Sequence, residues 1–207
     1  IVRGKQTHGA NPWGGVDPIV VGSQIVLGLQ TIVSRQLNIT EHPAIVTVGQ
    51  FSGGVRGNII PDSVVLVGTV RTFSETHRRE VFQRIAATAE HIAAASGARA
   101  ALHVDSGYIV TRNDEALTER MLPTLRRAAG ADKVQLEPLS TVAEDFSFFQ
   151  ERVPGMLFFL GITPPSQDWE TRPRNHSPLF EVDESALPVG VKAMAGLALD
   201  FLAQGRR

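Results

Sequence analysis

Residues 63–93 read SVVLVGTVRTFSETHRREVFQRIAATAEHIA and combine a β-strand with an amphipathic helix. The first eleven residues are rich in β-branched side chains, which is typical of a strand. Ser74 is a good acceptor for a helix N-terminus. The apolar residues that follow are three or four positions apart, which places them on one helix face: Val81, Ile85, Ala89 and Ile92. Gly97 then offers the usual end of such a helix. This stretch predicts a strand followed directly by a helix.

The flanking sequence extends this unit in both directions. Asp17 and Pro18 are a typical helix start, and the apolar spacing behind them predicts a helix that ends near Arg35. Residues 45–51 predict a strand that pairs antiparallel with residues 63–73, and residues 98–104 alternate as a further strand. The order is βαββαβ, a split βαβ (ferredoxin-like) fold with both helices on one sheet face. It occupies residues 1–106, with its first strand expected to be truncated.

Residues 107–207 predict a second domain of α/β type. A helix is expected from Asp114, kinked or broken near Pro123, followed by strands at 134–136 and 156–162 with a short helix at 143–150 between them. Asp183 is placed to cap the last helix. The fold class expected for the whole chain is therefore α/β, with an α+β first domain.

Composition narrows the function classes. The 207 residues carry 20 basic and 21 acidic side chains, a net charge of -1, so nucleic acid and membrane surfaces are not expected partners. The longest uninterrupted apolar run, residues 156–162, is too short for a membrane span. The absence of cysteine removes disulfides, cysteine nucleophiles and Cys-based zinc sites, and a cytoplasmic location is expected. The chain begins without Met, and we expect a fragment of a longer protein.

Six histidines are the first candidates for metal or acid–base chemistry. His8 lies in a Gly- and Pro-flanked loop, and His176 lies in a long loop before the last helix, where enzymes often place site residues. An ordinary loop histidine remains an alternative for His8, and a single histidine such as His176 is not by itself a metal site. The other four fall at positions typical of turns and solvated faces: His42, His77, His91 and His103.

Three polar residues allow both a functional and a structural interpretation. Glu144 begins the acidic pair of AEDFS, which is suited to acid–base work but is equally stabilised by a helix dipole. Arg71 shares a strand face with apolar residues, so it either reaches the sheet edge or meets an anion. Asn58 stands in a turn, where its amide bonds locally or contacts a ligand. No phosphate loop, dinucleotide fingerprint, serine elbow or His-Glu-x-x-His helix is present.

Seven segments, in order and at matching spacing over nearly all of the chain, resemble the aminoacylase/hippurate hydrolase family of metal-dependent amidohydrolases and exopeptidases. The resemblance is strongest to its N-acyl-amino-acid and indoleacetyl-amino-acid hydrolases. The segments are GKQTHGANP from Gly4, GVDP from Gly15, GNIIPD from Gly57, GTVRTF from Gly68, AEDFS from Ala143, PGMLFFLG from Pro154 and NHSPLF from Asn175.

The resemblance implies a lid domain that forms a homodimer, followed by the C-terminal part of a zinc-exopeptidase-like catalytic domain. It implies that His176 is a metal ligand and that His8 stabilises the oxyanion in the partner subunit's site. Asn58 and Arg71 would recognise the amide and the carboxylate of a small N-acyl amino acid. Glu144 matches a position near the metals, with no role assigned.

The family holds two divalent ions, for which zinc, manganese, cobalt and nickel all remain candidates here. The Cys-Gly-x-Asp-x-His stretch and the Glu-Glu pair that supply most ligands and the general base are absent from this sequence. We therefore expect the isolated chain to be inactive and not to retain the metals. The alternative is a non-catalytic dimerisation or small-ligand-binding module, because the split βαβ fold serves many functions.

Overall fold

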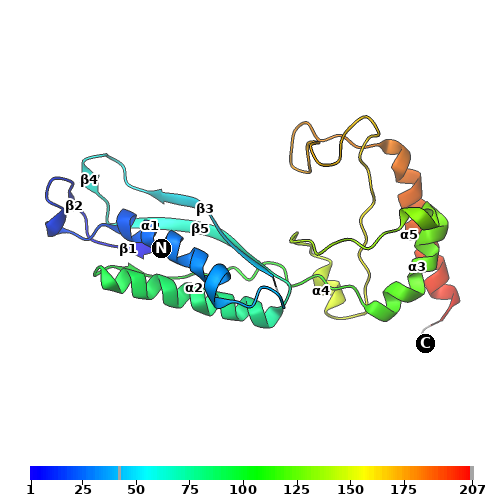
Figure 1. The fold of residues 1–207 in the computed structure, drawn as a ribbon, viewed down its shortest axis with the longest axis horizontal. Coiled ribbons are helices and arrows are strands. Elements are labelled where there is room, and N and C mark those ends of the chain that lie inside the picture. The colour runs from blue at the N-terminus through cyan, green and yellow to red at the C-terminus, as the bar shows by residue number, and fades with distance from the viewer. Residues whose placement is uncertain (42, 206–207) are drawn as a thin grey trace. The chain divides into compact units, whose positions relative to one another are not determined.

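The computed structural model describes residues 1–41 and 43–205, which form two compact units. Unit 1 holds Ile1–Val110 and Thr141–Ala143, and unit 2 holds Thr111–Ser140 and the residues from Glu144 onward (Figure 1). His42, which we interpreted as an ordinary turn residue, lies outside the described residues.

Unit 1 is built on a four-stranded antiparallel sheet with the strand order β3-β5-β1-β6. Along the chain its elements are β1 (Val2–Arg3), α1 (Pro18–Thr31), β3 (Ala44–Gly53), β5 (Ser63–Thr72), α2 (Glu75–Ala95) and β6 (Arg99–Ala100). A π-helical turn, η2 (Ile32–Gln36), extends α1. This order and this antiparallel pairing are those of the split βαβ fold, so the predicted fold class is confirmed.

The two helices begin at the predicted caps and cover one face of the sheet (Figure 1). Asp17 accepts hydrogen bonds from the N–H groups of Ile19 and Val20, and the Ser74 hydroxyl accepts one from His77 N–H. A continuous apolar core lies between helices and sheet, and burial of each large side chain in it contributes about 1.5–3 kcal/mol. Its members include Val2, Val21, Ile25, Leu29, Val46, Val64, Val81 and Ile85.

The strand predicted at 98–104 is much shorter than expected. Only Arg99–Ala100 pairs as a strand, with β1, and two further bonds follow it: Ala101 N–H donates to the Ile1 carbonyl, and the Ile1 amino group donates to the Ala101 carbonyl. A strand needs hydrogen-bonding partners along its length, and the antiparallel register places Ala101 opposite Ile1, so residues 102–104 have no partner among the described residues. The strand predicted at 98–104 is therefore confirmed only at Arg99–Ala100.

Unit 2 is mainly helical. It contains α3 (Glu115–Ala129), η3 (Ala131–Lys133), α4 (Ser147–Gln150), η4 (Glu184–Ala186) and α5 (Leu187–Ala203), and α3 packs on α5. Asp114 and Asp183 cap the helices as predicted, by accepting from Leu117 N–H and Ser185 N–H. The helix was predicted to be kinked or broken near Pro123, and the break does not occur: α3 continues through Pro123, which lacks one backbone donor.

The strands predicted at 134–136 and 156–162 are wrong. Within the described residues neither segment pairs with another strand. At Leu157 a side chain replaces the missing neighbour, since Asn113 donates to the Leu157 carbonyl at 2.8 Å and accepts from its N–H at 2.8 Å. Apolar composition predicted a buried strand, whereas residues 156–162 are half-buried or exposed, with Phe159 58% exposed. Strand formation depends on a partner that composition does not reveal.

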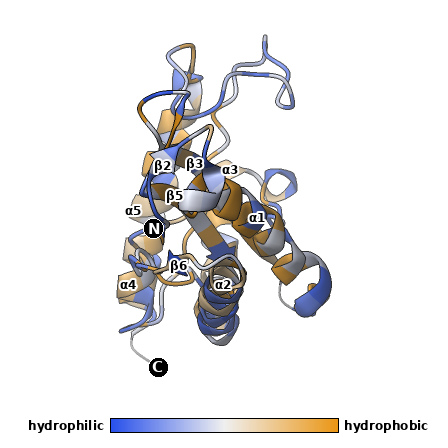
Figure 2. Cartoon of the chain, turned by 90° about the vertical axis from the view of Figure 1, so that its left-hand side faces the viewer, coloured by the Kyte–Doolittle hydropathy of each residue, from blue (hydrophilic) through white to orange (hydrophobic). Residues whose placement is uncertain are grey.

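Two helical segments are long and apolar enough, by length and composition alone, to cross a membrane: residues 18–36 and 184–203. Such segments are weak evidence, because helices packed inside a protein have the same composition. The first one packs Val21, Ile25 and Leu29 into the core of unit 1. Figure 2 shows that α1 and α5 carry mostly hydrophobic residues, and several of those on α5, such as Leu199 and Leu202, are exposed in this chain.

A polar contact joins α3 to α5 across an otherwise apolar packing. The Asp200 carboxylate accepts hydrogen bonds from the hydroxyl of the buried Thr124 and from the Arg127 guanidinium. The Thr124 bond, and then the bond and charge of Arg127, lower the pKa of Asp200 below its ordinary value. A lowered folded-state pKa means that ionised Asp200 stabilises the fold above the unfolded-state pKa of about 3.9.

We expect Asp200→Asn to lower the unfolding midpoint of unit 2 at neutral pH, because the charge-assisted bond to Arg127 is lost. Since the stabilisation disappears as the pH falls through the lowered pKa, the difference from the parent chain should shrink below about pH 4. Thermal unfolding followed by circular dichroism between pH 3 and 7 measures this difference. A gap that stays constant over this range would contradict the assignment.

Candidate functional site

His8 and Asn58 lie side by side at one end of unit 1. The short strands β2 (Thr7–His8) and β4 (Ile59–Ile60) pair antiparallel there, with His8 opposite Ile59 (Figure 1). The next contact along this ladder is a hydrogen bond of 2.8 Å from Gly9 N–H to the Asn58 carbonyl. Two residues fifty positions apart are thus held together by backbone pairing, and both are exposed.

The imidazole of His8 has a defined orientation. Its Nδ1 accepts a hydrogen bond of 3.1 Å from Ala10 N–H, and its carbonyl accepts one of 2.8 Å from Asn11 N–H. When Nδ1 accepts, the proton of a neutral ring is on Nε2, so Nε2–H is the group available to an external acceptor. His8 therefore presents a hydrogen-bond donor to its surroundings.

The loop that carries His8 is closed at its base. Lys5 and Val16 exchange two backbone hydrogen bonds, of 2.9 and 3.0 Å. Gly15 makes this closure feasible, because a Cβ at that position would lie 2.4 Å from the Lys5 carbonyl oxygen. Gly4 has the same role, since its Cβ would lie 2.1 Å from the Val16 carbonyl oxygen.

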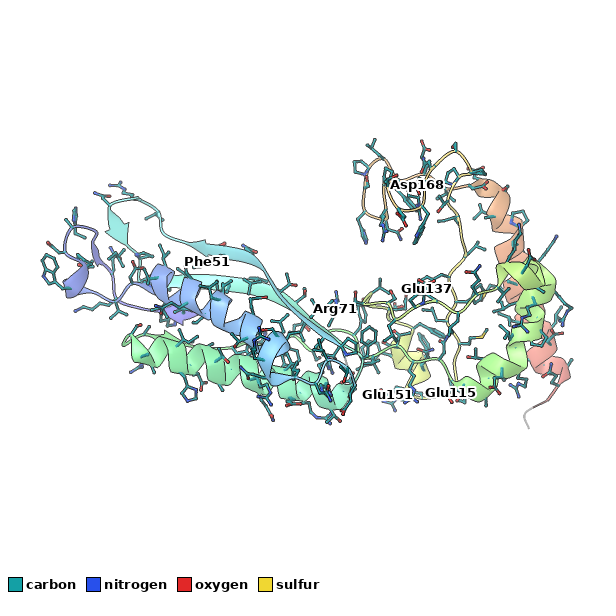
Figure 3. All side chains as sticks on the ribbon, in the orientation of Figure 1. Phe51, Arg71, Glu115, Glu137, Glu151 and Asp168 are labelled. Carbon is teal, nitrogen blue, oxygen red and sulfur yellow. The ribbon has the colours of Figure 1, made fainter. Side chains whose placement is uncertain are left out.

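Arg71 lies at the opposite end of the sheet in unit 1 (Figure 3). It pairs with Ile45 of β3, eight residues along β5 from Ser63, which at about 3.4 Å per residue is about 27 Å. Its side chain is half-buried and forms no ion pair within the described part of the chain. The structure therefore groups His8 with Asn58 and separates Arg71 from both.

His176 occupies a strained position in the loop that precedes η4. Its φ is 73°, the one positive value among the non-glycine residues described, and a hydrogen bond of 3.0 Å from Ser177 N–H to the Arg174 carbonyl closes the turn around it. Such backbone strain in a non-glycine residue is enriched at functional sites. Within residues 1–41 and 43–205, no group of three His, Asp or Glu side chains is arranged to hold a metal ion.

Glu144 takes part in the start of α4. Its carboxylate accepts from Phe146 N–H at 3.3 Å, and its carbonyl accepts from the Ser147 hydroxyl at 2.7 Å. These bonds form a turn just before α4, whose N-cap residue is Phe146 and has no side-chain cap.

Sequence reasoning missed one group of side chains. Trp169, Arg172, Arg174 and Phe180 gather within the loop that holds His176. The motif W-E-T-R-P-R, in which two arginines follow a tryptophan closely, was the available signal.

Comparison with known proteins identifies unit 1. Residues 1–96 match the peptidase dimerisation domain of the M20 family. The first domain of this chain belongs to that family. Solved structures agree over both units: one from methicillin-resistant Staphylococcus aureus has a TM-score of 0.81 at 29% identity, over 97% of this chain and 51% of that chain. The Bacillus subtilis YXEP protein, a dinuclear metal-binding M20 peptidase, has a TM-score of 0.64 at 30% identity, over 96% and 48%.

Curated proteins similar to this chain include hydrolases. N-acetyl-L-cysteine deacetylase of Bacillus subtilis is 43% identical over 90% of this chain and 42% of its own length. An IAA-amino acid hydrolase ILR1-like protein of Arabidopsis thaliana is 33% identical over 97% and 46%. The predicted membership of the amidohydrolase family is confirmed. The chain spans about half the length of these relatives.

The loop of the dimerisation domain offers a direct test of how His8 is positioned. We expect Gly15→Ala to destabilise unit 1 by about 1–3 kcal/mol, as overpacking does, because the new methyl group meets the Lys5 backbone. Gly57→Ala is the matched control, since nothing lies within 4 Å of its Cβ position. Denaturant unfolding compares the two variants. Equal effects would show that the close approach at Gly15 is not a constraint.

Proposed function

We propose that this chain is part of a metal-dependent amidohydrolase that cleaves the amide bond of N-acyl amino acids. The observation that carries the proposal is the placement of His8, with its Nε2–H available as donor, on a loop whose next residue, Gly9, hydrogen-bonds the Asn58 backbone. An amide substrate needs such a donor where negative charge develops on the carbonyl oxygen. The hydrolase relatives support the reaction class.

Each site residue then has a chemical role. His8 donates to the oxyanion, an interaction worth about 3–4 kcal/mol in comparable sites. Asn58 bonds the substrate amide, and Arg71, which has no anionic partner in the described chain, binds the substrate carboxylate with its planar fork. His176 is proposed as a metal ligand, and divalent metal would supply the activation of water.

The proposed metal site needs more ligands than His176. A catalytic divalent site takes about three protein ligands, and among the described residues His176 belongs to no group of three or more His, Asp or Glu side chains that could hold a metal ion. We therefore assign no step through metal to these residues and propose that the other ligands belong to the remainder of a longer protein. A cytoplasmic location and the absence of nucleic-acid and membrane partners stay predictions, as does the role of Glu144.

The geometry of unit 1 supports a homodimer whose sites are shared. Within one chain Arg71 lies about 27 Å along β5 from Ser63, and His8 pairs with β4, which precedes Ser63, so the two residues are too far apart to contact one small substrate. If both act on one substrate, they come from different subunits. The edge strand β3 is ten residues long, and its outer edge is unpaired within the described chain, so it is available to a second copy.

The alternative is a non-catalytic dimerisation or small-ligand module. The exposed surface of α5 argues for the hydrolase, since apolar residues such as Leu199 and Leu202 are expected to be covered by further parts of a catalytic domain. On the same grounds we propose that unit 1 is the lid and that unit 2 is part of the catalytic domain.

The full-length protein should release amino acid from N-acetyl amino acids only with divalent metal, whereas the 207-residue chain should be inactive and bind zinc weakly. Ninhydrin detection of product and calorimetric zinc titration measure both properties. Submicromolar zinc binding, or turnover by the short chain above a metal-only blank, would contradict the ligand assignment. Absence of turnover by full-length protein on a panel of N-acyl amino acids would favour the module.

Arg71→Ala in the full-length enzyme should lower kcat/KM by roughly 30-fold to several thousand-fold, because removing one partner of a buried charge pair costs about 2–5 kcal/mol. Arg71→Lys should also be impaired, because an ammonium does not reproduce the two-pronged contact. The loss should nearly vanish when the substrate carboxylate is replaced by a carboxamide. An equal loss on both substrates would show that Arg71 does not bind the carboxylate.

A mixed dimer tests whether His8 acts on the partner's site. One subunit carries His8→Ala, and the other carries intact His8 but has lost its metal ligands, His176 included. If His8 acts across the interface, the metal-competent site receives an intact His8 and should keep near-normal activity per site. An inactive mixed dimer would show that His8 serves its own chain.

A further inference from the structure

Two arginines and two aromatic rings form a cluster in unit 2, within the loop that includes Asp168 (Figure 3). The Arg172 Cζ lies 5.3 Å from the ring centroid of Trp169 and 5.6 Å from that of Phe180, and the Arg174 Cζ lies 5.1 Å from that of Trp169. All three distances are within the range of attractive cation–π contacts. Trp169 is 57% exposed, so the cluster is open to solvent.

Neither arginine of this cluster forms an ion pair with a carboxylate in the described part of the chain. Three acidic residues share the loop, Asp168, Glu170 and Glu181, and two of them bond other groups. Glu181 accepts from the Gln167 amide at 2.6 Å and Asp168 accepts from Glu170 N–H at 3.0 Å. The Arg172 Nε is buried without a hydrogen-bond partner. Two like charges beside one ring repel each other, and a bound anion would relieve that repulsion.

The cluster is joined to His176 through one backbone turn. Arg174 is the first residue of the turn that Ser177 N–H closes, and His176 stands within that turn. The first and last Cα atoms of such a turn are less than about 7 Å apart. A ligand that contacts the Arg174 side chain is therefore bound in the same loop as the proposed metal ligand.

We propose that Arg172 and Arg174 bind a carboxylate, and that the substrates of this site carry a second carboxylate besides the one assigned to Arg71. The planar guanidinium donates two parallel hydrogen bonds to a carboxylate, and the aromatic rings hold both groups in place without neutralising them. Substrates with an acidic amino-acid side chain and substrates with a dicarboxylic acyl group both meet this requirement. The identity of the substrate rests on the proposed function, whereas carboxylate binding does not.

Binding is testable on the 207-residue chain without metal or turnover. Trp13→Phe leaves Trp169 as the sole tryptophan, because the sequence contains two. Glutarate, added at constant ionic strength, should change Trp169 emission in a saturable way, and acetate should bind at least tenfold more weakly. Arg172→Gln and Arg174→Gln should each weaken glutarate binding about tenfold or more, since one hydrogen bond to a charged group is worth that factor. Arg152→Gln, at an 83% exposed side chain outside the loop, is the matched control and should bind like the parent.

Two results would overturn the proposal. In the first, Trp169 emission does not respond to glutarate, whereas Arg172→Gln shifts the emission of the chain without added anion. That result means that the arginines only hold the Trp169 ring in place. The other is a response that Arg152→Gln weakens as much as Arg174→Gln, which means non-specific screening.

Turnover by the full-length enzyme then separates the substrate claim from the hydrolase claim. N-acetylglutamate should exceed N-acetylglutamine in kcat/KM, or N-succinylalanine should exceed N-acetylalanine, and Arg174→Gln should reduce the preferred ratio about tenfold. The pair that shows the preference identifies the side chain or the acyl group as the source of the carboxylate. Turnover with neither preference overturns the substrate claim and leaves the hydrolase intact. Glutarate binding without any turnover contradicts the hydrolase and leaves the carboxylate site standing.

Discussion

The central position of β1 in the sheet is the constraint on which unit 1 depends. Val2 is buried in the core, and this two-residue strand bonds to β5 on one side and β6 on the other. Because β1 leads directly into Gly4 and Lys5, its place also determines where the His8 loop starts. The Lys5–Val16 closure then leads the chain back to Asp17 and α1, whose buried face covers the same sheet. The position of β1 therefore determines both the packing of the core and the place of the His8 loop.

The same sheet explains why the candidate residues form two groups. β4 ends just before β5 begins, so Asn58 is placed at the first end of β5 and Arg71 at its far end. Distance in space does not follow separation in sequence here. The Asn58 backbone lies close to the His8 loop although fifty residues separate them, whereas the thirteen residues from Asn58 to Arg71 run along an extended strand and place the two far apart. A rigid strand of this length suits a dimer in which each end serves a different site.

Much of unit 1 could be predicted because its signals are local. The Asp17 and Ser74 caps, the apolar stripes of α1 and α2 and the β-branched runs of β3 and β5 act within a few residues, and all agree with the fold. The partnership of His8 with Asn58 was not predictable from residue patterns, because it depends on the β2–β4 register. The positive φ of His176 and the hydrogen bond from Ala10 N–H to the His8 ring were likewise not predictable from the sequence.

Prediction failed in unit 2 where an element needs a partner that lies elsewhere. Residues 156–162 have the apolar composition of a buried strand, yet Asn113 supplies hydrogen bonds that a neighbouring strand would otherwise make. The arginine cluster failed to stand out for the opposite reason, because charged loop residues are ordinarily solvated. The placement of two guanidinium groups against one indole, with two nearby carboxylates bonded to other groups, separates Arg172 and Arg174 from ordinary surface charges. In both cases the decisive information is which polar groups lack a partner within their own segment. For residues 156–162 these are backbone groups that a neighbouring strand would bond, and for Arg172 and Arg174 they are the guanidinium groups for which we propose a carboxylate.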